Sequence, residues 1–373
     1  MSHLKYRLLV GAALAALGLI AAAPAPPQDS WPLFRGDPLE TGVRPAGALP
    51  DKLEELWKFS AKDAIDGAPA VADGVVYVGS EDEHLYAVNL ADGAKKWEYK
   101  AGPIKASPGC HDGAVYVGDS NGLFHCVDAA SGAKRWTFPT GAEIESGASF
   151  AGDNVLFGSY DETLYCFDKN GKKVWAFKTA GPVNGSAAVV GDRTFVAGCD
   201  SVLHILDVQK GTELNSVDLG GQAAATAAVL GDKLYVGTMA EEVHEVDWKN
   251  AALGWTFRPA KRAEPFFASA AVTDAIVVVG SRDHRVRGLD RKTGNEVWSF
   301  LTEANVDSSP VVVGDRVYAG SLDGKLYVLD LTKGTEITHY ELDAGVSGSP
   351  AVVAGRLLVG TEKGTLYCFG AKK

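Results

Sequence analysis

The stretch Val75-Val76-Tyr77-Val78-Gly79-Ser80 decides the fold, because variants of it recur as far as residue 360 of the 373-residue chain. The run Val317-Tyr318-Ala319-Gly320-Ser321 repeats its pattern near the other end of the sequence. Eight such β-rich runs end in a glycine, at Gly79, Gly118, Gly158, Gly198, Gly237, Gly280, Gly320 and Gly360. Successive glycines are spaced by about 40 residues, and such a period made of short strands predicts stacked structural repeats.

Residues 307–342 show one repeat in full. Apolar or alternating runs at 308–313, 316–320, 325–330 and 335–341 are separated by Asp/Gly-containing turns. This sequence pattern indicates four antiparallel strands joined by tight turns. Four strands per repeat of about 40 residues describe a propeller blade. We therefore expect an all-β, eight-bladed propeller of four-stranded antiparallel blades.

The fourth strand of six repeats has a tryptophan at its centre. These residues are Trp57, Trp97, Trp136, Trp175, Trp255 and Trp298, and the remaining two repeats have Asn215 and Thr338. A ring of that size on an outer strand can bury over about 150 Å² against the next blade. We predict that the six tryptophans dock neighbouring blades and do not bind a cofactor.

The two ends of the repeat array complement each other. Residues 347–369 supply three strands of an eighth repeat, whereas residues 53–59 have the sequence of a fourth strand without the first three. Closing a ring in this way removes an exposed sheet edge. We therefore expect residues 53–59 to complete the last blade.

Residues 1–25 differ from the rest of the chain. Basic residues up to Arg7 precede an apolar stretch at 8–23 and small residues suited to cleavage. This pattern predicts a signal peptide at 1–25, and an uncleaved anchor is the alternative. An extended linker and strap would occupy 26–52, and the propeller 53–370. No cysteine follows the apolar stretch before Cys110, so we expect a periplasmic or secreted monomer without a lipid anchor and with no membrane span after cleavage.

The net charge narrows the classes of possible partner, and the cysteine positions indicate whether disulfides form. The formal net charge is −11, which disfavours nucleic acid as a partner. Cys126, Cys166 and Cys368 occupy the same position in three different repeats, and Cys110 and Cys199 lie elsewhere. Equivalent residues on stacked sheets lie about 10 Å apart, too far for a disulfide. We expect free, buried thiols.

The tandem pattern resembles the pyrroloquinoline-quinone-like (PQQ-like) repeat family over about residues 51–370. Leu85–Asn89 with Gly93 and Trp97 in one repeat, and 286–298 in another, carry the resemblance. It implies an eight-bladed propeller with tryptophan docking. Trp31-Pro32-Leu33-Phe34-Arg35-Gly36 also looks like the opening of exported bacterial members, and we expect it to pack on the propeller.

Two branches of that family imply different functions. BamB-type proteins bind partners during outer-membrane protein assembly, whereas quinoprotein dehydrogenases bind PQQ with calcium. The nearly insertion-free spacing and the absence of adjacent cysteines favour the first branch. We expect a non-catalytic, BamB-like binding scaffold of the cell envelope with another envelope protein as its partner, and with neither metal nor cofactor. A small PQQ-dependent oxidoreductase is the alternative, and a structural envelope protein without a ligand is a third hypothesis.

The residues just before each innermost strand are candidates for a binding site at the channel rim. Counting back by the same number of positions from every repeat glycine gives Asp66, Lys105, Glu145, Gly185, Ala224, Phe267, Asp307 and Ser347. Three acids and one lysine on such a ring could bind a cation or a polar ligand. A solvated rim without a ligand is the alternative.

The interval from Gly237 to Gly280 is the longest between repeat glycines, and it places extra length at 258–267. Arg258, Lys261, Arg262, Phe266 and Phe267 make this segment both basic and aromatic. Such a mixture is typical of a protein-binding loop. A tolerated insertion without a function is the alternative.

Overall fold

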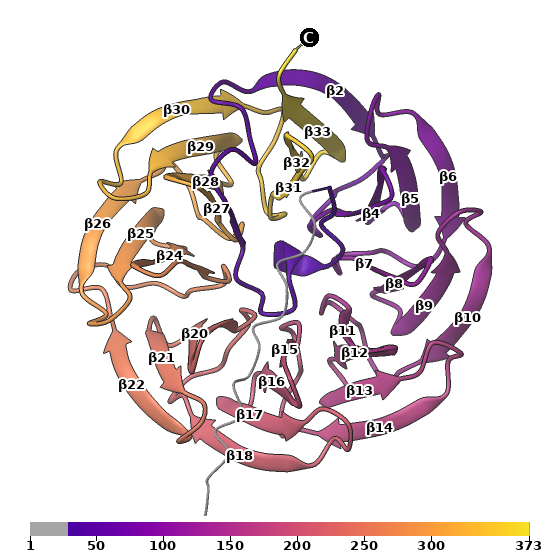
Figure 1. Cartoon of the computed structure of the whole chain (residues 1–373), viewed down its shortest axis with the longest axis horizontal. Helices are drawn as coiled ribbons and strands as arrows, with labels where there is room; N and C mark the ends of the chain where they lie inside the picture. The colour runs from indigo at the N-terminus through magenta and orange to yellow at the C-terminus, as the bar shows by residue number, and fades with distance from the viewer. Residues whose placement is uncertain (1–28, 373) are drawn as a thin grey trace, which may run out of the picture.

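The computed structural model describes residues 29–372 and forms a closed ring of eight blades around a central channel (Figure 1). In blades 1 to 7 the four strands follow the chain outward from the channel, and in blade 8 the outermost strand comes from the N-terminal end of the propeller sequence; neighbouring blade strands are antiparallel. Blades 1 and 2 contain β3 (Ala70–Ala72), β4 (Val75–Ser80), β5 (His84–Asn89), β6 (Lys95–Lys100), β7 (Gly109–His111), β8 (Ala114–Gly118), β9 (Leu123–Asp128) and β10 (Lys134–Pro139). Blades 3 and 4 contain β11 (Ser149–Ala151), β12 (Asn154–Ser159), β13 (Thr163–Phe167), β14 (Lys173–Lys178), β15 (Ala188–Val190), β16 (Arg193–Ala197), β17 (Val202–Asp207) and β18 (Glu213–Asp218).

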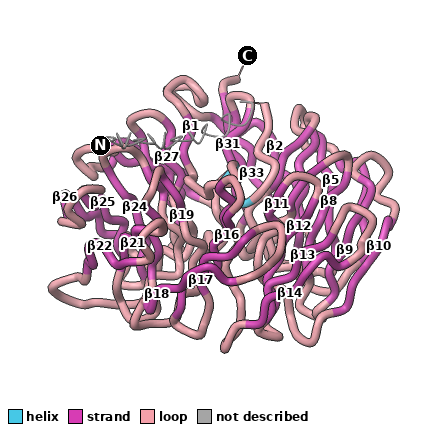
Figure 2. Tube along the Cα trace, turned by 60° about the horizontal axis from the view of Figure 1, so that its bottom comes forward, coloured by secondary structure: helices cyan, strands magenta, loops and turns pink. Residues whose placement is uncertain are grey.

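The second half of the ring has the same plan. Blades 5 and 6 contain β19 (Ala228–Leu230), β20 (Lys233–Gly237), β21 (Val243–Asp247), β22 (Ala252–Phe257), β23 (Ala271–Val272), β24 (Ile276–Ser281), β25 (Arg285–Asp290) and β26 (Glu296–Leu301). Blades 7 and 8 contain β27 (Val311–Val313), β28 (Arg316–Gly320), β29 (Lys325–Asp330), β30 (Glu336–Glu341), β31 (Ala351–Val353), β32 (Arg356–Gly360), β33 (Thr365–Gly370) and the N-terminal β2 (Glu54–Ser60). The strands run between the two faces of the ring, so turns and loops gather on both faces (Figure 2). The predicted fold class is confirmed.

The N-terminal strand closes the ring as predicted. β2 pairs antiparallel with β33, with Trp57 opposite Cys368 and Ser60 opposite Thr365. The last blade is therefore assembled from both ends of the propeller sequence, and β33 has a partner on each side. Pairing on both sides leaves the third strand of this blade without a free edge.

The recurring glycine lets neighbouring blades approach closely. Gly79 lies near the end of β4, and a Cβ added there would overlap the Ile104 side chain, which precedes the first strand of blade 2. The same contact recurs around the ring as Gly118 with Ile144, Gly158 with Val183, Gly237 with Phe266, Gly280 with Val306, Gly320 with Val346 and Gly360 with Ile65. Each large apolar side chain fills the space that the glycine leaves on the preceding blade.

Blade 4 differs from the predicted register by one residue. Ala197, not Gly198, pairs with Leu203 at the position where Gly79 pairs with Leu85. The residue at the position that faces it, which is Ile, Val or Phe in the other blades, is Ala223 here, and it is fully buried. A methyl group on each side thus replaces the glycine and large side chain found elsewhere, so the assignment of Gly198 to the repeat was wrong.

This contact predicts coupled stability effects. Gly79→Ala should destabilise the fold by about 1–3 kcal/mol through overpacking. Ile104→Ala should destabilise it by about 2–5 kcal/mol through a cavity. The double variant should lose less than the sum of the two, because the new methyl occupies part of that cavity. Urea unfolding measures all three, and Gly79→Ala combined with the distant Val346→Ala is the additive control. If the destabilisations add in the double variant Gly79→Ala/Ile104→Ala as they do in the control pair, the contact between Gly79 and Ile104 is contradicted.

Six tryptophans dock neighbouring blades through one repeated geometry. Each indole Nε1 donates a hydrogen bond of 2.8–3.1 Å to a backbone carbonyl of the next blade, and each ring covers a glycine there that has a positive φ. Trp57 of the closing strand, for example, bonds to the carbonyl of Leu90 in blade 1 and covers Gly93. A side chain on these glycines would collide with the indole.

The two repeats without this tryptophan have different replacements. At Asn215, blade 5 supplies the indole instead: Trp248 packs edge-on against Phe195 of blade 4, with ring centroids 5.3 Å apart. Next to Thr338, the third and fourth strands of blade 8 come from opposite ends of the propeller sequence, so no turn joins them to receive an indole. There Tyr340 packs against Phe369 of blade 8.

Residues 29–50, here called the strap, run across the inner strands of the ring (Figure 1). The strap includes the 3-10 turn η1 (Phe34–Gly36) and β1 (Val43–Arg44), which pairs parallel with β27. It bonds to the innermost strand of every blade, at Val71, Cys110, Ser149, Val189, Val229, Val272, Val312 and Val352 in turn. The expected packing of Trp31–Gly36 on the propeller is confirmed.

The strap buries a charged group at the centre of the ring. Arg35 is 1% exposed and donates to the carbonyl oxygens of Ser309 (3.0 Å), Ala270 (3.2 Å) and Pro310. Burial lowers the pKa of Arg35 to about 10 and, with the nearby Asp37 carboxylate, raises the pKa of Glu40 well above its usual value. The charges of Arg35 and Glu40 therefore stabilise each other where water does not reach.

Two further observations concern the N-terminal and cysteine expectations. The predicted signal peptide lies outside the described residues. Within residues 29–372, no helix has the length and apolar character needed to cross a membrane. All five cysteines are free thiols, four of them buried.

Candidate functional site

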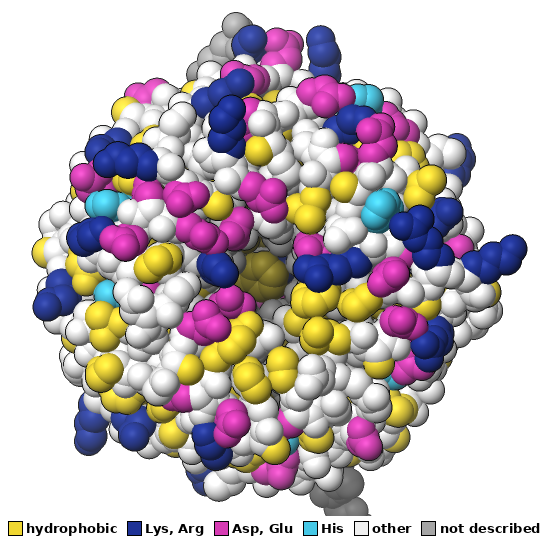
Figure 3. All heavy atoms as spheres, turned by 180° about the vertical axis from the view of Figure 1, so that it is seen from behind, with side chains coloured by type: hydrophobic (Ala, Val, Ile, Leu, Met, Phe, Trp, Pro, Cys, Tyr) yellow, Lys and Arg dark blue, Asp and Glu magenta, His cyan; other side chains and the backbone are white. Residues whose placement is uncertain are grey.

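A cavity of about 430 Å³ occupies the channel on the face opposite to that seen in Figure 1. Figure 3 shows this face hollowed at the centre, with apolar surface at the bottom and charged side chains around the opening. Phe34 of η1 is the strap residue among those that line the cavity. The strap therefore contributes to the inner wall, and the connections between blades form the mouth.

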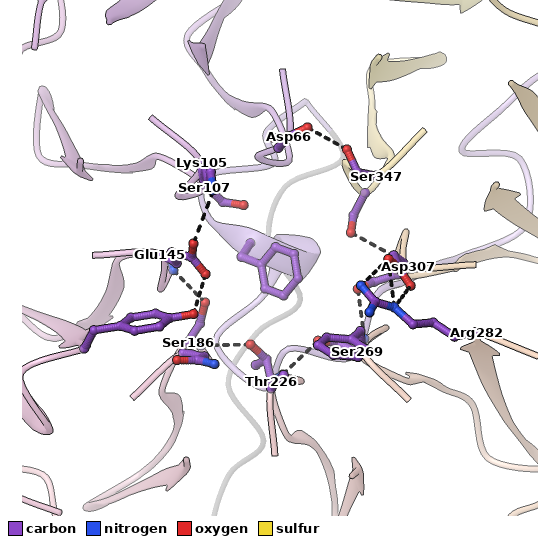
Figure 4. Close-up of a pocket in the computed structure, with 18 residues that line it drawn as sticks. Asp66, Lys105, Ser107, Glu145, Ser186, Thr226, Ser269, Arg282, Asp307 and Ser347 are labelled. Atoms are coloured by element: carbon purple, nitrogen blue, oxygen red, sulfur yellow. Dashed lines mark hydrogen bonds and ion pairs between the residues drawn. The ribbon is translucent and has the colours of Figure 1, made fainter. Parts of the chain in front are cut away.

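Hydroxyl groups from six of the eight blades, all except blades 1 and 3, form an incomplete ring inside the cavity (Figure 4). They belong to Ser107, Ser186, Thr226, Ser269, Ser309 and Ser349. Each oxygen accepts a hydrogen bond of 2.8–3.1 Å from a backbone N–H of the preceding blade. One lone pair of each oxygen is used in this way, which leaves the second one and the hydroxyl proton for groups in the channel.

The structure brings the predicted rim residues together at the mouth. Asp66, Lys105, Glu145, Ala224, Phe267, Asp307 and Ser347 all line the cavity. In blade 4 the lining residue is Asn184 and not the predicted Gly185, because the repeat register there follows Ala197. The predicted rim position was therefore right in seven blades and wrong by one residue in blade 4.

The rim carboxylates already have partners. Asp66 accepts from the Ser347 hydroxyl at 2.7 Å, and Glu145 accepts from the Tyr160 hydroxyl at 2.7 Å. Arg282 binds both oxygens of Asp307, and its guanidinium stacks 3.8 Å from the centre of the Phe267 ring. Lys105 is held less tightly than Arg282, because its ion pairs with Glu81 and Glu145 are longer.

Sequence reasoning missed Arg282 and Tyr160, which line the cavity, and also Glu81 and Glu362, which lie near the rim residue Asp66. All four stand two positions after a repeat glycine, in the turn between the second and third strands. The same period that located the rim would have found them. Each of these turns lies beside the connection that enters the next blade, as the bond from Ile104 N to Ser80 O shows.

The mouth is an electronegative environment. Burial, a hydrogen bond with Asp66 and the charge of Asp66 raise the pKa of Glu81. Burial, followed by the charges of Asp66 and Asp307, raises the pKa of Glu362. Carboxyl groups also outnumber cations there: five of them, including Glu145, face the two cations of Lys105 and Arg282.

The donor set does not suit a calcium–quinone site. Among the described residues, no three His, Cys, Asp or Glu side chains converge as metal ligands. Asp307 is bound bidentately by Arg282, and Asp66 and Glu145 come from different blades. The rim acids therefore do not assemble the oxygen ligands that calcium requires.

The 258–267 segment separates into a surface part and a buried part. Arg258, Lys261 and Arg262 are exposed, and Arg258 forms ion pairs with Glu241 and Glu242. Phe266 is fully buried against Gly237, so the structure does not present it to a partner as the sequence reading expected. Its equivalence to Ile104 in the repeat explains this position.

Comparisons with known proteins agree with this architecture. Residues 51–122, 100–228 and 199–373 match the family described as outer membrane protein assembly factor BamB. No curated protein matches the chain in sequence. Because the family matches extend from residue 51 to residue 373, they include every blade of the ring.

Solved structures share the fold at low sequence identity. BamB from Moraxella catarrhalis is 20% identical with a TM-score of 0.74, covering 86% of this chain and 98% of its own. The quinohemoprotein alcohol dehydrogenase from Comamonas testosteroni is 14% identical with a TM-score of 0.81, covering 94% and 82%. The computationally designed Ika8 protein is 18% identical with a TM-score of 0.74, covering 85% and 100%. These likenesses concern the fold alone, whereas the family match across the whole ring shows that the chain belongs to the family of outer membrane protein assembly factor BamB.

Proposed function

We propose that this protein is a non-catalytic scaffold of the cell envelope, exported to the periplasm, that binds another envelope protein. It does so through the face of the ring that carries the channel mouth and residues 258–265. The observation that carries this proposal is the uneven distribution of extra sequence. The spacing of the repeat glycines stays near its period everywhere except between Gly237 and Gly280, and the longer connection within that interval lies on this face. The family description supports an envelope protein as the partner.

The surface of that connection has the chemistry of a polar interface rim. Lys261 and Arg262 are exposed, and neither has a described ion-pair partner, whereas Arg258 is anchored by Glu241. Anchoring of one end by an ion pair limits how far the segment moves, which lowers the entropy cost of binding. Two adjacent cations on such a segment fit an acidic patch on the partner.

Reversing these two charges tests the proposal. Lys261→Glu/Arg262→Glu should lower capture of the partner from envelope extract by at least about tenfold, because like charges would then meet across the interface. The melting temperature should not change, since both side chains are exposed. Capture is measured by quantitative mass spectrometry with the immobilised protein.

The matched control reverses two exposed cations away from this face. Lys172→Glu/Lys173→Glu changes the total charge equally at the turn before β14 and in its first residue, both exposed. It should leave capture intact. Equal capture by both charge-reversal variants would refute the assignment of the binding face.

A further inference from the structure

We propose that the channel cavity binds an alkylammonium group, supplied either by a lysine side chain of another protein or by a free polyamine. The carboxylates of Asp66, Glu81 and Glu145 at the mouth would hold the ammonium. From there the methylene chain of a polyamine would extend inward toward Phe34, whereas that of a protein lysine would lead outward to its backbone. This site differs from the surface of residues 258–265 and does not depend on the proposed scaffold function.

The first argument is that the protein already places an ammonium there. Lys105 Nζ lies 3.9 Å from Glu81 Oε1 and 3.8 Å from Glu145 Oε1, at the outer limit of an ion pair. Its side chain is 43% exposed, so the contact is loose. The mouth can therefore accommodate an ammonium between two carboxylates, and this one does not satisfy them fully.

The second argument is the balance of charge. Arg282 binds both oxygens of Asp307 and stacks on Phe267, so its charge is directed to Asp307 and not to the other carboxylates. Burial, a hydrogen bond with Asp66 and, third, repulsion by the Asp66 charge raise the pKa of Glu81. A bound cation would relieve that repulsion.

The third argument is the ring of hydroxyl oxygens deeper in the cavity. Six Ser and Thr oxygens, on residues that are 3–9% exposed, each retain a lone pair after accepting a backbone N–H. An ammonium has three donors and no acceptor, so it pairs with such oxygens and with carboxylates alike. The aromatic surface of Phe34 suits a methylene chain and attracts a cation.

The volume supports a slender ligand. About 430 Å³ is at the small end of the range for ligand pockets. An ammonium on a chain of four or five methylenes can enter this space, whereas a folded domain cannot. The ligand is therefore a single extended side chain or a linear polyamine.

The experiment is isothermal titration of the full chain with two probes at low ionic strength. Cadaverine represents a free polyamine, and the blocked peptide acetyl-Gly-Gly-Lys-Gly-Gly-amide represents a protein lysine. Binding of either probe supports the proposal and identifies the source of the ammonium. Raising the salt to about 0.15 M, where charges are screened beyond about 8 Å, should weaken it.

Three variants make the test specific. Asp66→Asn/Glu81→Gln should weaken binding by at least about tenfold, since it removes two of the carboxylates. Lys105→Met should strengthen binding by about tenfold, because the competing internal ammonium is gone. Glu98→Gln/Glu336→Gln removes two exposed carboxylates from the outer strands β6 and β30 and should leave binding unchanged.

Two results would overturn the inference. One is the absence of heat with both probes at low salt in the wild-type protein. The other is an equal loss of affinity in the rim variant and in the outer-strand control, or weaker binding in Lys105→Met. Partner capture through Lys261 and Arg262 would be unaffected by either result, so this inference and the proposed function fail separately.

Discussion

Trp57→Ala is expected to lower the free energy of unfolding by about 3–5 kcal/mol, as for other buried tryptophans. Its indole covers Gly93 and bonds to Leu90 across the seam between the last and first blades. The same truncation at Trp175, which is equally buried and bonds to the Val208 carbonyl, should have a similar cost. Chemical denaturation of both variants measures these values.

The two variants should differ in how they unfold. Trp175 lies in a blade whose four strands are consecutive in sequence, whereas Trp57 lies on a strand that joins blade 8 from the other end of the propeller. Loss of Trp57 leaves β2 held by its pairing with β33 and by Phe59 packed on Tyr86. Release of β2 exposes β33 as a free edge, which promotes aggregation.

We therefore expect Trp57→Ala to show a smaller denaturant m-value and concentration-dependent light scattering on heating. Trp175→Ala should retain one cooperative transition and remain soluble. Identical unfolding and scattering of the two variants would show that β2 is not the closing element that its pairing suggests.

Most of this fold was predictable from sequence because the same local pattern of strands and turns occurs eight times along the chain. Glycines, turns and tryptophans recurred at one spacing, so an ambiguous strand in one repeat was resolved by its counterparts. Only the blade 4 register was misplaced. There Gly198 was assigned as the repeat glycine, but the adjacent Ala197 occupies the equivalent position in the blade. The compensating Ala223 lies beyond the outer strand of the same blade, in the connection to blade 5, and gave no local signal.

The candidate site was predictable in outline but not in detail. Counting from the repeat glycines located the rim, since the distance in sequence from the rim to the glycine is constant. Pairings such as Arg282 with Asp307 were not predictable, because they depend on rotamers and on the approach of adjacent blades. The burial of Phe266 was predictable by the same count, since Phe266 precedes Phe267 as Ile104 precedes Lys105; it was missed because Phe266 was interpreted as part of the longer connection.

The strap was predicted to pack on the ring, but its central role depends on contacts that sequence does not reveal. Arg35 reads as an ordinary surface residue beside a glycine. In the structure it is buried, and it bonds to the carbonyls of Ala270 and Ser309 in the connections before β23 and β27. Contacts between residues so distant in sequence are set by ring closure, which no local pattern encodes.

Arg35→Met is expected to destabilise the protein by about 3–5 kcal/mol at neutral pH, the cost of removing one partner from a buried charge group. The methionine preserves most of the apolar volume. What is lost is the guanidinium, which bonds three carbonyl oxygens and compensates the nearby Glu40. Glu40 is fully buried, and one of its carboxylate oxygens has no described hydrogen-bond partner, so its charge would then be nearly uncompensated.

The size of this effect should depend on pH. Burial and the charge of Asp37 already raise the pKa of Glu40 above its usual 4.5, and loss of Arg35 removes the charge that opposes this shift. An acid with a raised pKa in the folded state favours folding below its unfolded pKa, and this contribution is lost as pH rises through the interval up to the folded pKa. Arg35→Met should therefore be least destabilising near pH 4.5 and increasingly destabilising toward pH 8.

Adding Glu40→Gln separates the charge from the hydrogen bonds. The double variant Arg35→Met/Glu40→Gln has no carboxylate at position 40, so most of the extra loss between pH 4.5 and pH 8 should disappear. The pH-independent part, from the three carbonyl groups left without a donor, should remain. Urea unfolding across this pH range gives both quantities. A pH profile of Arg35→Met parallel to the wild type would show that Glu40 is not compensated by Arg35, and that the strap is held by its backbone bonds alone.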